Sequence, residues 1–280
     1  MHAGAPTLLS RPVATATLRA MRTANPAGEH VLVLTPVKQA ARRLDHHFGT
    51  LAALDFPKER ISLGLLDSDS DDGTFAALRA REPALAAAYR RVTLLQHDYG
   101  FRLPPGVPRW DPSVQLARRA VLARSRNRLL SGALRDEDWV LWLDVDLETY
   151  PPDVLVHLLA TGKDVVTPHC VKAPGGDTFD RNAWREHGRV RLDVLRGGPD
   201  VVPLDAVGGT MLLVRADLHR DGLVFPPYPY GDASPLARRP TPLVGVDVGE
   251  IETEGLGLMA HDMGHGCWGM PNLEIVHADA

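Results

Sequence analysis

The first half of the chain alternates short apolar runs with longer segments whose apolar residues recur at helical spacing. Each run is rich in Val and Leu and is closed by Pro or Asp, which is typical of strands buried on both faces of a parallel sheet. The alternation predicts such a sheet with right-handed crossovers. We expect strands at 30–36, 61–67, 91–98 and 138–146, and helices at about 38–54, 74–90 and 113–133.

The second half continues with one more helix and strand and then changes character. Beyond Cys170 the apolar runs shorten, and residues 225–249 are so rich in proline that we expect them to be mobile. Gly208-Gly209 interrupts an apolar stretch, which predicts a strand pair or one bent strand. The expected elements are helices at about 152–161 and 250–263 and strands at 164–169, 201–218, 267–270 and 273–277.

This pattern predicts an α/β fold whose mostly parallel central sheet is flanked by helices. Residues 1–29 lack steady periodicity and are expected to form a loose arm. We expect a single domain over 30–280, with a nucleotide-binding half at 30–146 and an acceptor-side half at 147–280. Ser113 is the expected N-cap of the helix at 113–133.

Composition narrows the class of protein. The chain has 280 residues, and its 31 Lys and Arg against 35 Asp and Glu leave no excess of positive charge for nucleic acid. Cys170 and Cys267 could form at most one disulfide, which is no disulfide framework. The longest apolar runs, such as VLVL at 31–34, are too short to span a membrane, and the N-terminus does not read as a signal peptide. We therefore expect a soluble, cytoplasmic protein of enzyme size.

The most informative segment is VLWLDVDLE at 140–148. Asp144 and Asp146 follow a buried strand and are expected at its C-terminal end, where ligands bind in open α/β sheets. Two carboxylates one residue apart in an extended strand share a face, so both can approach one hard cation such as Mn²⁺ or Mg²⁺. This predicts a metal-bridged diphosphate; the alternative is that the two acids end a strand and face solvent.

Two further clusters of polar and charged residues have the chemistry to bind a nucleotide. In GLLDSDSDDGT at 64–74 we expect Asp67 and Asp69 to hydrogen-bond a ribose or base, although acids there also cap helices. Arg126 or Arg128 on the preceding helix could neutralise a diphosphate, although a solvated helical face explains most arginines.

Five blocks occur along the chain in fixed order. They are WVLWLDVD, FDRNAW (179–184), VGGTMLLVRADLHRDGLVFPP (207–227), IETEGLGLMA (251–260) and GMPNLEIVH (269–277). Together they resemble the fungal mannan polymerase α-mannosyltransferases, glycosyltransferase family 62. The resemblance runs from about His30 to His277 and implies a GT-A fold, a nucleotide-sugar donor (GDP-mannose in the fungal members), Mn²⁺, and transfer with retention of configuration.

The resemblance also implies residue roles. It implies that the metal ligands are Asp144, Asp146 and His277. It implies acceptor-side or charge-stabilising acids at Glu252 and Glu254, and it leaves Trp184 either lining the sugar site or in the core. Gly208 and Gly209 either let the backbone approach the sugar or form a simple bend. The donor-binding set it implies is Pro36, Asp67, Asp69, Arg126, Asn127, Asp144, Asp180, Gly208 and Gly209.

The chain departs from the family pattern in two respects. The fungal members carry an N-terminal membrane anchor and work in the Golgi, whereas no such segment is expected here. The chain also carries an insertion at 231–250 beside the expected acceptor site, so the acceptor stays open as a glycan, a lipid or a small molecule.

We expect a metal-dependent retaining hexosyltransferase, mannosyltransferase-like, that uses a nucleotide-diphosphate sugar. Front-face transfer and double displacement remain open. A metal-dependent nucleotidyltransferase and a non-catalytic nucleotide-sugar-binding or scaffold member are the alternatives.

Overall fold

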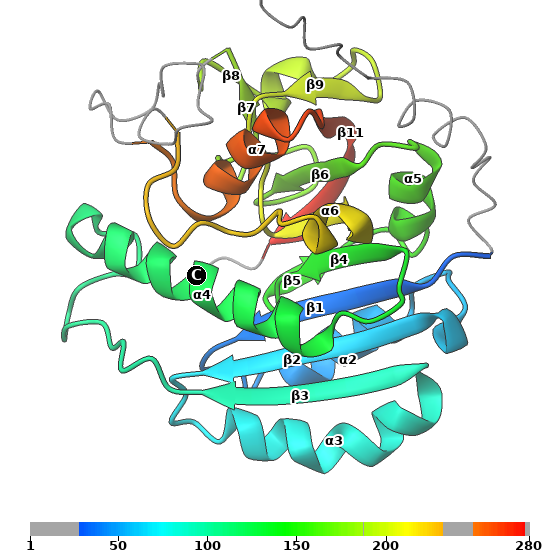
Figure 1. Cartoon of the computed structure of the whole chain (residues 1–280), viewed down its shortest axis with the longest axis vertical. Coiled ribbons are helices and arrows are strands. Elements are labelled where there is room, and N and C mark those ends of the chain that lie inside the picture. Colours follow the sequence, from blue (N-terminus) through cyan, green and yellow to red (C-terminus); the bar gives the residue numbers. More distant parts are fainter. Residues whose placement is uncertain (1–27, 187, 232–248, 278–280) are drawn as a thin grey trace, which may run out of the picture.

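The computed structural model describes residues 28–186, 188–231 and 249–277. One nine-stranded sheet forms the centre, with the strand order β3-β2-β1-β4-β10-β6-β11-β5 and with β9 paired to β11 (Figure 1). The first four strands in sequence run parallel to one another. They are β1 (Val31–Val37), β2 (Ile61–Ser68), β3 (Arg91–His97) and β4 (Trp139–Leu143).

The second half of the chain completes the sheet by non-local pairing. β10 (Met211–Arg215) enters antiparallel between β4 and β6 (Val165–Val171). β11 (Cys267–His277) lies parallel to β6 and pairs antiparallel with β5 (Leu147–Thr149) and β9 (Val202–Leu204). A separate two-stranded sheet consists of β7 (Trp184–Arg185) and β8 (Val190–Arg191).

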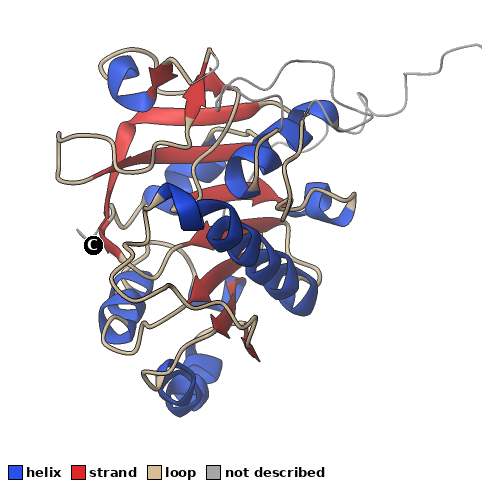
Figure 2. Ribbon diagram, turned by 90° about the vertical axis from the view of Figure 1, so that its left-hand side faces the viewer, coloured by secondary structure: helices blue, strands red, loops and turns tan. Residues whose placement is uncertain are grey.

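Helices cover both faces of the sheet (Figure 2), because alternate strand residues are apolar on both sides. One apolar cluster packs β1, β2 and β4 against α2 (Leu44–Ala52), α3 (Thr74–Ala88) and α5 (Val154–Ala160). The other packs the opposite sides of these strands against α4 (Pro112–Ala133), α6 (Ala216–Arg220) and α7 (Glu252–Asp262). The short 3₁₀ helices are η2 (Lys58–Arg60) and η3 (Leu192–Leu195).

The predicted α/β class with a mostly parallel central sheet is confirmed. The predicted C-terminal end of the fourth strand, at residue 146, is wrong, because β4 ends at Leu143 and residues 144–146 form a turn. There the backbone N–H of Asp144 donates to the carbonyl of Thr210 at 2.9 Å, and the chain crosses to pair with β11. The two acids therefore do not share a face of an extended strand.

Three smaller predictions also need correction. The two strands expected at 267–270 and 273–277 form one strand, β11, whose register shifts between Met270 and Glu274. The N-cap of α4 is Asp111, whose carboxylate accepts from the N–H of Ser113, with Pro112 in the first turn. The helix expected from residue 38 begins at Leu44.

Some expectations fall outside the described residues. The arm expected at 1–29 and the segment expected to be mobile at 225–249 fall mostly on residues 1–27 and 232–248. Both cysteines are buried free thiols.

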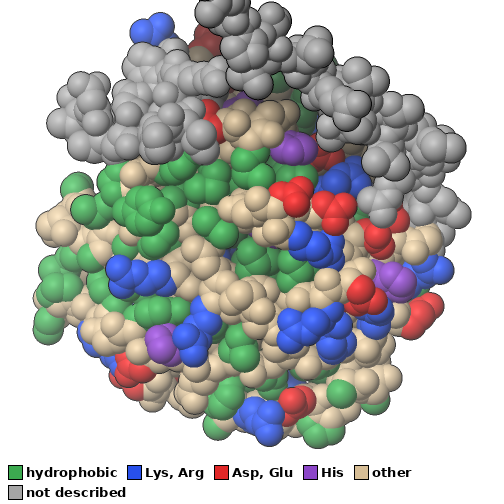
Figure 3. Space-filling model, viewed as in Figure 1, with side chains coloured by type: hydrophobic (Ala, Val, Ile, Leu, Met, Phe, Trp, Pro, Cys, Tyr) green, Lys and Arg blue, Asp and Glu red, His purple; other side chains and the backbone are tan. Residues whose placement is uncertain are grey.

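Within the described ranges, no helix combines the length and the apolar character needed to cross a bilayer. Acidic and basic side chains are interspersed on the face shown in Figure 3.

Candidate functional site

The carboxyl ends of β1, β2 and β4 meet at one edge of the sheet, where polar residues from distant parts of the sequence converge. The turn after β4 directs Asp146 towards the last residue of β11, because Leu147 pairs with His277. Nε2 of His277 lies 3.0 Å from Oδ1 of Asp146. The imidazole stacks on Phe179 with ring centroids 3.7 Å apart, which holds its plane. Two predicted metal ligands, more than a hundred residues apart in sequence, are therefore in contact.

Arg126 is the most heavily engaged side chain of the site. It is 2% exposed, and its guanidinium lies over the rings of Trp142 and Phe225, 5.4 and 5.1 Å from their centroids. Nη2 donates to Oδ1 of Asp144 and to the carbonyl of Gly209, each at 3.2 Å. Nε lies 3.0 Å from Oε1 of Glu252. Arg126 thus joins α4, the turn after β4, the segment before β10 and the start of α7.

The two acids of the turn occupy different electrostatic environments. Burial raises the pKa of Asp144 to about 7, assisted by the neighbouring Asp146 and Asp180 and opposed by Arg126 and His277. Burial also acts to raise the pKa of Asp146, but the hydrogen bond and charge of His277, together with Arg109, outweigh it and lower the pKa. Asp146 is therefore the carboxylate that this environment keeps ionised.

Asp180 holds the glycine segment in place. Its Oδ2 accepts from the N–H of Gly209 at 2.9 Å and from the N–H and hydroxyl of Thr210, each at 3.2 Å. A side chain at position 208 would collide with this carboxylate, and one at position 209 would crowd Thr253 and Arg126. The glycines therefore permit close packing of Asp180, Thr253 and Arg126 around the segment.

Residues predicted to bind a nucleoside lie at the ends of β1 and β2. Pro36 pairs with Leu66 in the register, one position before Val37 pairs with Asp67. Burial raises the pKa of Asp67, and hydrogen bonds from Ser70 and Gln96 oppose the rise. Asp69, with φ of 60°, accepts from the N–H groups of Tyr99 and Phe101 at 2.7 and 3.3 Å. Asp69 thus fixes the loop after β3 over this edge.

The side chains of Asn127 and Trp184 make structural contacts within the fold. The side-chain amide of Asn127 donates to the carbonyl of Phe225 at 2.7 Å and accepts from its N–H at 2.9 Å. Trp184 is 1% exposed, so it belongs to the core, which was one of the two alternatives for this residue. Neither side chain is among those that line the cavity beside Asp146.

The predicted acids at the start of α7 are both buried and paired with arginines. Glu252, which adopts a left-handed φ of 63°, faces Arg126. Glu254 pairs with Arg119, whose guanidinium also donates to the carbonyl of Ile251 at 2.6 Å. Burial raises the pKa of Glu254, and Arg119 opposes the rise. These contacts tie the N-terminus of α7 to α4.

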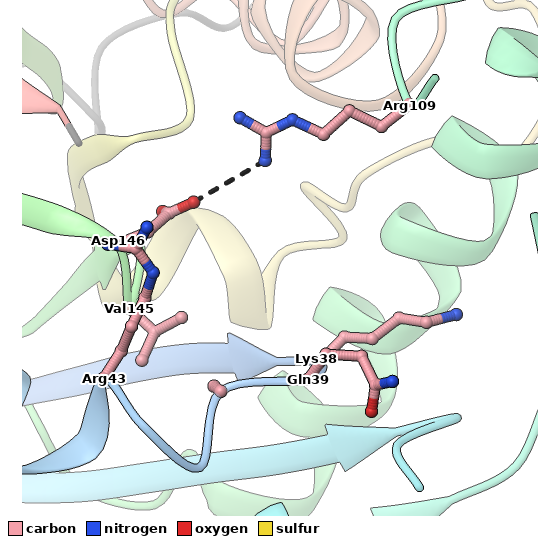
Figure 4. A pocket seen from close by; sticks show the side chains of 7 residues that line it. Lys38, Gln39, Arg43, Arg109, Val145 and Asp146 are labelled. Atoms are coloured by element: carbon pink, nitrogen blue, oxygen red, sulfur yellow. Dashed lines mark ion pairs between the residues drawn. The ribbon is translucent and has the colours of Figure 1, made fainter. Parts of the chain in front are cut away.

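A cavity of about 160 Å³ opens beside Asp146 (Figure 4). The guanidinium of Arg109 points at Asp146, with Nη1 3.7 Å from Oδ2, and Arg43 lies on the other side of the turn. The sequence analysis did not predict the positively charged side chains that line this cavity, although Lys38 directly follows the end of β1. The lining residues are Lys38, Gln39, Ala40, Arg43, Arg109, Val145 and Asp146.

The donor atoms at this edge suit a hard divalent cation. Carboxylates and a neutral imidazole are ligands that Mn²⁺ accepts, and Asp146 and His277 are already in contact. Asp144, two residues from Asp146, is turned towards Arg126. Across the described ranges, no three His, Cys, Asp or Glu side chains are grouped as a ready-made metal cage. The chemistry of the donor set fits the metal.

Comparison with known proteins agrees with the resemblance inferred from the motifs. The chain is 30% identical to the mannan polymerase II complex anp1 subunit of Schizosaccharomyces pombe, over 89% of this chain and 64% of that protein. It is 29% identical to the mannan polymerase complex subunit mnn9 of the same organism, over 89% of this chain and 80% of that protein. The chain thus spans less than two thirds of the first relative.

A similar fold occurs in the mannosyltransferase PcManGT from Pyrobaculum calidifontis, solved in complex with GDP-Man and Mn²⁺. The TM-score is 0.55 at 19% identity, over 89% of this chain and 57% of that chain. This likeness confirms the predicted GT-A type of fold. The Anp1 family matches residues 12–196 and 196–229, which is most of the chain. This chain is therefore a member of the Anp1 family.

Proposed function

We propose that the chain is a metal-dependent, retaining glycosyltransferase that moves a hexosyl group, mannosyl in our proposal, from GDP-mannose to an acceptor hydroxyl. The observation that carries this proposal is the contact between Asp146 and His277 at the mouth of a basic cavity, beside Asp144. Membership of a family with mannan polymerase subunits supports the mannosyl donor. In this proposal 30–146 binds the nucleotide and 147–280 carries the acceptor side.

Asp144, Asp146 and His277 would hold Mn²⁺ or Mg²⁺. When bound, the cation would supply positive charge to the departing nucleoside diphosphate. The protein must present both carboxylates ionised, and Arg126 assists by opposing the rise in the pKa of Asp144. Phe179 keeps the imidazole in plane, so that Nε2 faces the acids.

The other predicted residues divide into two roles in this proposal. Pro36, Asp67 and Asp69 lie where the strand ends would receive the nucleoside. Asp180, Gly208 and Gly209 position the segment that contacts Arg126, and Asn127 anchors α4 to Phe225.

Glu252 and Glu254 are positioning residues in this proposal. They act through Arg126 and Arg119, which fits front-face transfer because that route needs no enzyme nucleophile. The acceptor hydroxyl would attack from the face that the leaving diphosphate vacates.

Titration with GDP and UDP, each with and without Mn²⁺, tests the donor assignment, and an assay of GDP-mannose hydrolysis tests catalysis. We expect Mn²⁺-dependent binding of GDP, slow hydrolysis of GDP-mannose, and loss of both in Asp146→Ala. Asp153→Ala is the matched control, because Asp153 is a half-exposed acid at the start of α5 that pairs with His157. Robust metal-dependent activity in Asp146→Ala would refute the metal assignment.

A second candidate is a non-catalytic nucleotide-sugar-binding subunit. It is favoured by one observation, namely that the two yeast relatives carry names as subunits of complexes. Binding of GDP with Mn²⁺ but without hydrolysis or transfer would support it. Release of pyrophosphate from a nucleoside triphosphate and a sugar phosphate would instead support a nucleotidyltransferase.

A further inference from the structure

Residues 99–128 differ in charge from the rest of the chain. They hold seven arginines and a single acid, Asp111, whereas the whole chain carries a formal net charge of −4. The helix within this stretch, α4, has no acidic residue along its length. The seven arginines are Arg102, Arg109, Arg118, Arg119, Arg124, Arg126 and Arg128. A strongly basic segment in a mildly acidic protein indicates a local partner of negative charge.

Two of these arginines are exposed on α4 without a counter-ion. Arg102, Arg119 and Arg126 are paired with acids of the fold. Arg124 and Arg128 are exposed, and neither side chain forms a hydrogen bond or an ion pair with any residue in the described part of the chain. Because these two arginines lie four residues apart on a helix, they project from the same face. That face presents positive charge to whatever lies against it.

The N-terminal end of the same face carries exposed apolar side chains. Trp110 is 73% exposed and Leu116 is 60% exposed. Leu116 begins the row 116, 120, 124 and 128, whose members follow one another at helical spacing towards the two exposed arginines. Leu103, on the loop before α4, is 37% exposed. Exposed apolar side chains gathered on one side of a protein indicate an interaction surface.

Hydrogen bonds hold the loop that carries Trp110 against α4. The side-chain amide of Gln115 donates to the carbonyl of Arg109 and, at 3.3 Å, to the carbonyl of Asp111. The carboxylate of Asp111 in turn accepts from the N–H of Ser113 at 2.9 Å. In both ribbon views α4 lies on the outside of the sheet (Figures 1 and 2). The apolar and the basic side chains are therefore presented together on one fixed surface.

The α4 surface is defined here as Trp110, Leu116, Arg124 and Arg128, and its chemistry matches an anionic lipid bilayer. Tryptophan is favoured at the level of the lipid headgroups, and arginines next to exposed apolar side chains are attracted to anionic lipids. A stable protein interface needs about 800 Å² on each partner with an apolar centre, which two large apolar side chains do not supply. A second copy of the chain is disfavoured because a two-fold contact would place arginines against arginines.

We propose that the α4 surface binds the headgroups of an anionic lipid bilayer, with its two apolar side chains at headgroup level and its two arginines paired with lipid charges. This inference goes beyond the transferase function and does not depend on it. Arg109 lines the cavity beside Asp146 and directly precedes Trp110 in the chain. A bilayer bound at the α4 surface would therefore lie near that cavity.

The test is co-sedimentation with vesicles of phosphatidylcholine alone or of phosphatidylcholine and phosphatidylserine in equal parts. The wild type should bind the second kind of vesicle more tightly, and added salt should weaken this binding. Trp110→Ser combined with Leu116→Ser should weaken it by about tenfold or more, because apolar contact with the bilayer is lost. Arg124→Gln combined with Arg128→Gln should also weaken it by about tenfold or more, since each arginine near an anionic surface contributes about a factor of five.

Matched control variants change the same residue types elsewhere on the molecule. Val194→Ser removes an apolar side chain that is 70% exposed on η3. Arg79→Gln removes an exposed arginine of α3. Both control variants should bind phosphatidylserine vesicles like the wild type, because neither residue belongs to the α4 surface.

Tryptophan fluorescence reports contact with the bilayer directly. Trp110 is exposed, whereas the other four of the five tryptophans are buried or partly buried. Phosphatidylserine vesicles should therefore shift the emission of the wild type to shorter wavelength and reduce its quenching by acrylamide. Trp110→Phe should still bind the vesicles but should lose this shift. An equal shift in Trp110→Phe would show that the bilayer contacts another part of the molecule and would overturn the proposal.

The remaining outcomes separate this proposal from its rivals. Absence of vesicle binding by the wild type, or wild-type binding by both double variants, would overturn it. Light scattering that shows an oligomer of the wild type, dissociated by Trp110→Ser with Leu116→Ser, would instead make the surface an interface between copies. Thermal unfolding should be unchanged in this double variant, because both side chains are exposed. Its binding of GDP with Mn²⁺ should also be unchanged, so failure of GDP binding by the wild type would refute only the transferase proposal.

Discussion

The arginines of α4 and its preceding loop form two groups that differ in what surrounds them. Arg119 and Arg126 are paired with buried acids at the start of α7. Arg109 lines the cavity beside Asp146, and neither Arg109 nor Arg118 donates a side-chain hydrogen bond to a partner among the described residues. A charge paired with buried acids stabilises the framework, whereas a charge without such a partner is available to a ligand. The following predictions test this division.

Arg126→Met should cause the largest loss of stability. The substitution retains an apolar stem between Trp142 and Phe225 but leaves Glu252 buried without its cation. We expect the free energy of unfolding to fall by about 3 to 5 kcal/mol, measured by urea denaturation. The double variant Arg126→Met with Glu252→Gln should recover part of this loss. An unchanged urea midpoint in the single variant would show that Arg126 belongs with the arginines available to a ligand.

Acid should destabilise the protein through a histidine of the framework. Burial lowers the pKa of His219 to about 4, and its two ring nitrogens contact Trp142 at 3.3 Å and the carbonyl of Leu223 at 2.7 Å. The unfolded chain binds this proton near pH 6.5, whereas the native state does so only near pH 4. Stability from this group is therefore present above about pH 6.5 and is lost as the pH falls towards 4, by about 3 kcal/mol.

The measurement is the urea midpoint between pH 7 and pH 5. His219→Gln should be less stable at pH 7 but should depend less steeply on pH, because the titrating group is gone. An identical pH slope in the variant and the wild type would contradict this role.

Asp180→Ala should have a smaller effect on stability. It leaves the N–H groups of Gly209 and Thr210 without their acceptor, which costs about 1 to 3 kcal/mol. Asp180→Asn keeps one acceptor oxygen and should lose less stability. Because the segment contacts Arg126 through the carbonyl of Gly209, GDP binding should also weaken in Asp180→Ala. Full stability in the alanine variant would show that the segment does not depend on this carboxylate.

Asp111→Ala should have the smallest effect. Asp111 caps α4 and accepts from the N–H of Ser113 at 2.9 Å, and loss of such a cap costs about 1 kcal/mol. Ser113→Ala, at the position expected from sequence to cap the helix, should cost less because that hydroxyl only donates to Asp111. Chemical denaturation of both variants checks this order, and the reverse order would restore the sequence prediction.

Local patterns predicted much of this protein. Alternating apolar runs located β1, β2, β3 and the helices between them, because a buried parallel strand is recognisable from a few consecutive residues. The Asp144-Val145-Asp146 motif, the position of His277 and the family were also readable from the chain. Each of these features depends on neighbouring residues or on blocks whose order is preserved.

What the sequence could not decide depends on pairing over long distances. Only the tertiary structure brought β5 beside the end of β11, which turns Asp146 towards His277 in place of continuing the strand. Likewise, sequence singled out Arg126 for the donor, yet folding gave Arg126 three polar partners and gave the side chain of Arg118 no hydrogen bond or ion pair among the described residues. Residue types and their spacing therefore determined the kind of chemistry, whereas the partners of each charge, set by burial and by distant strands, decided which residues are free to perform it.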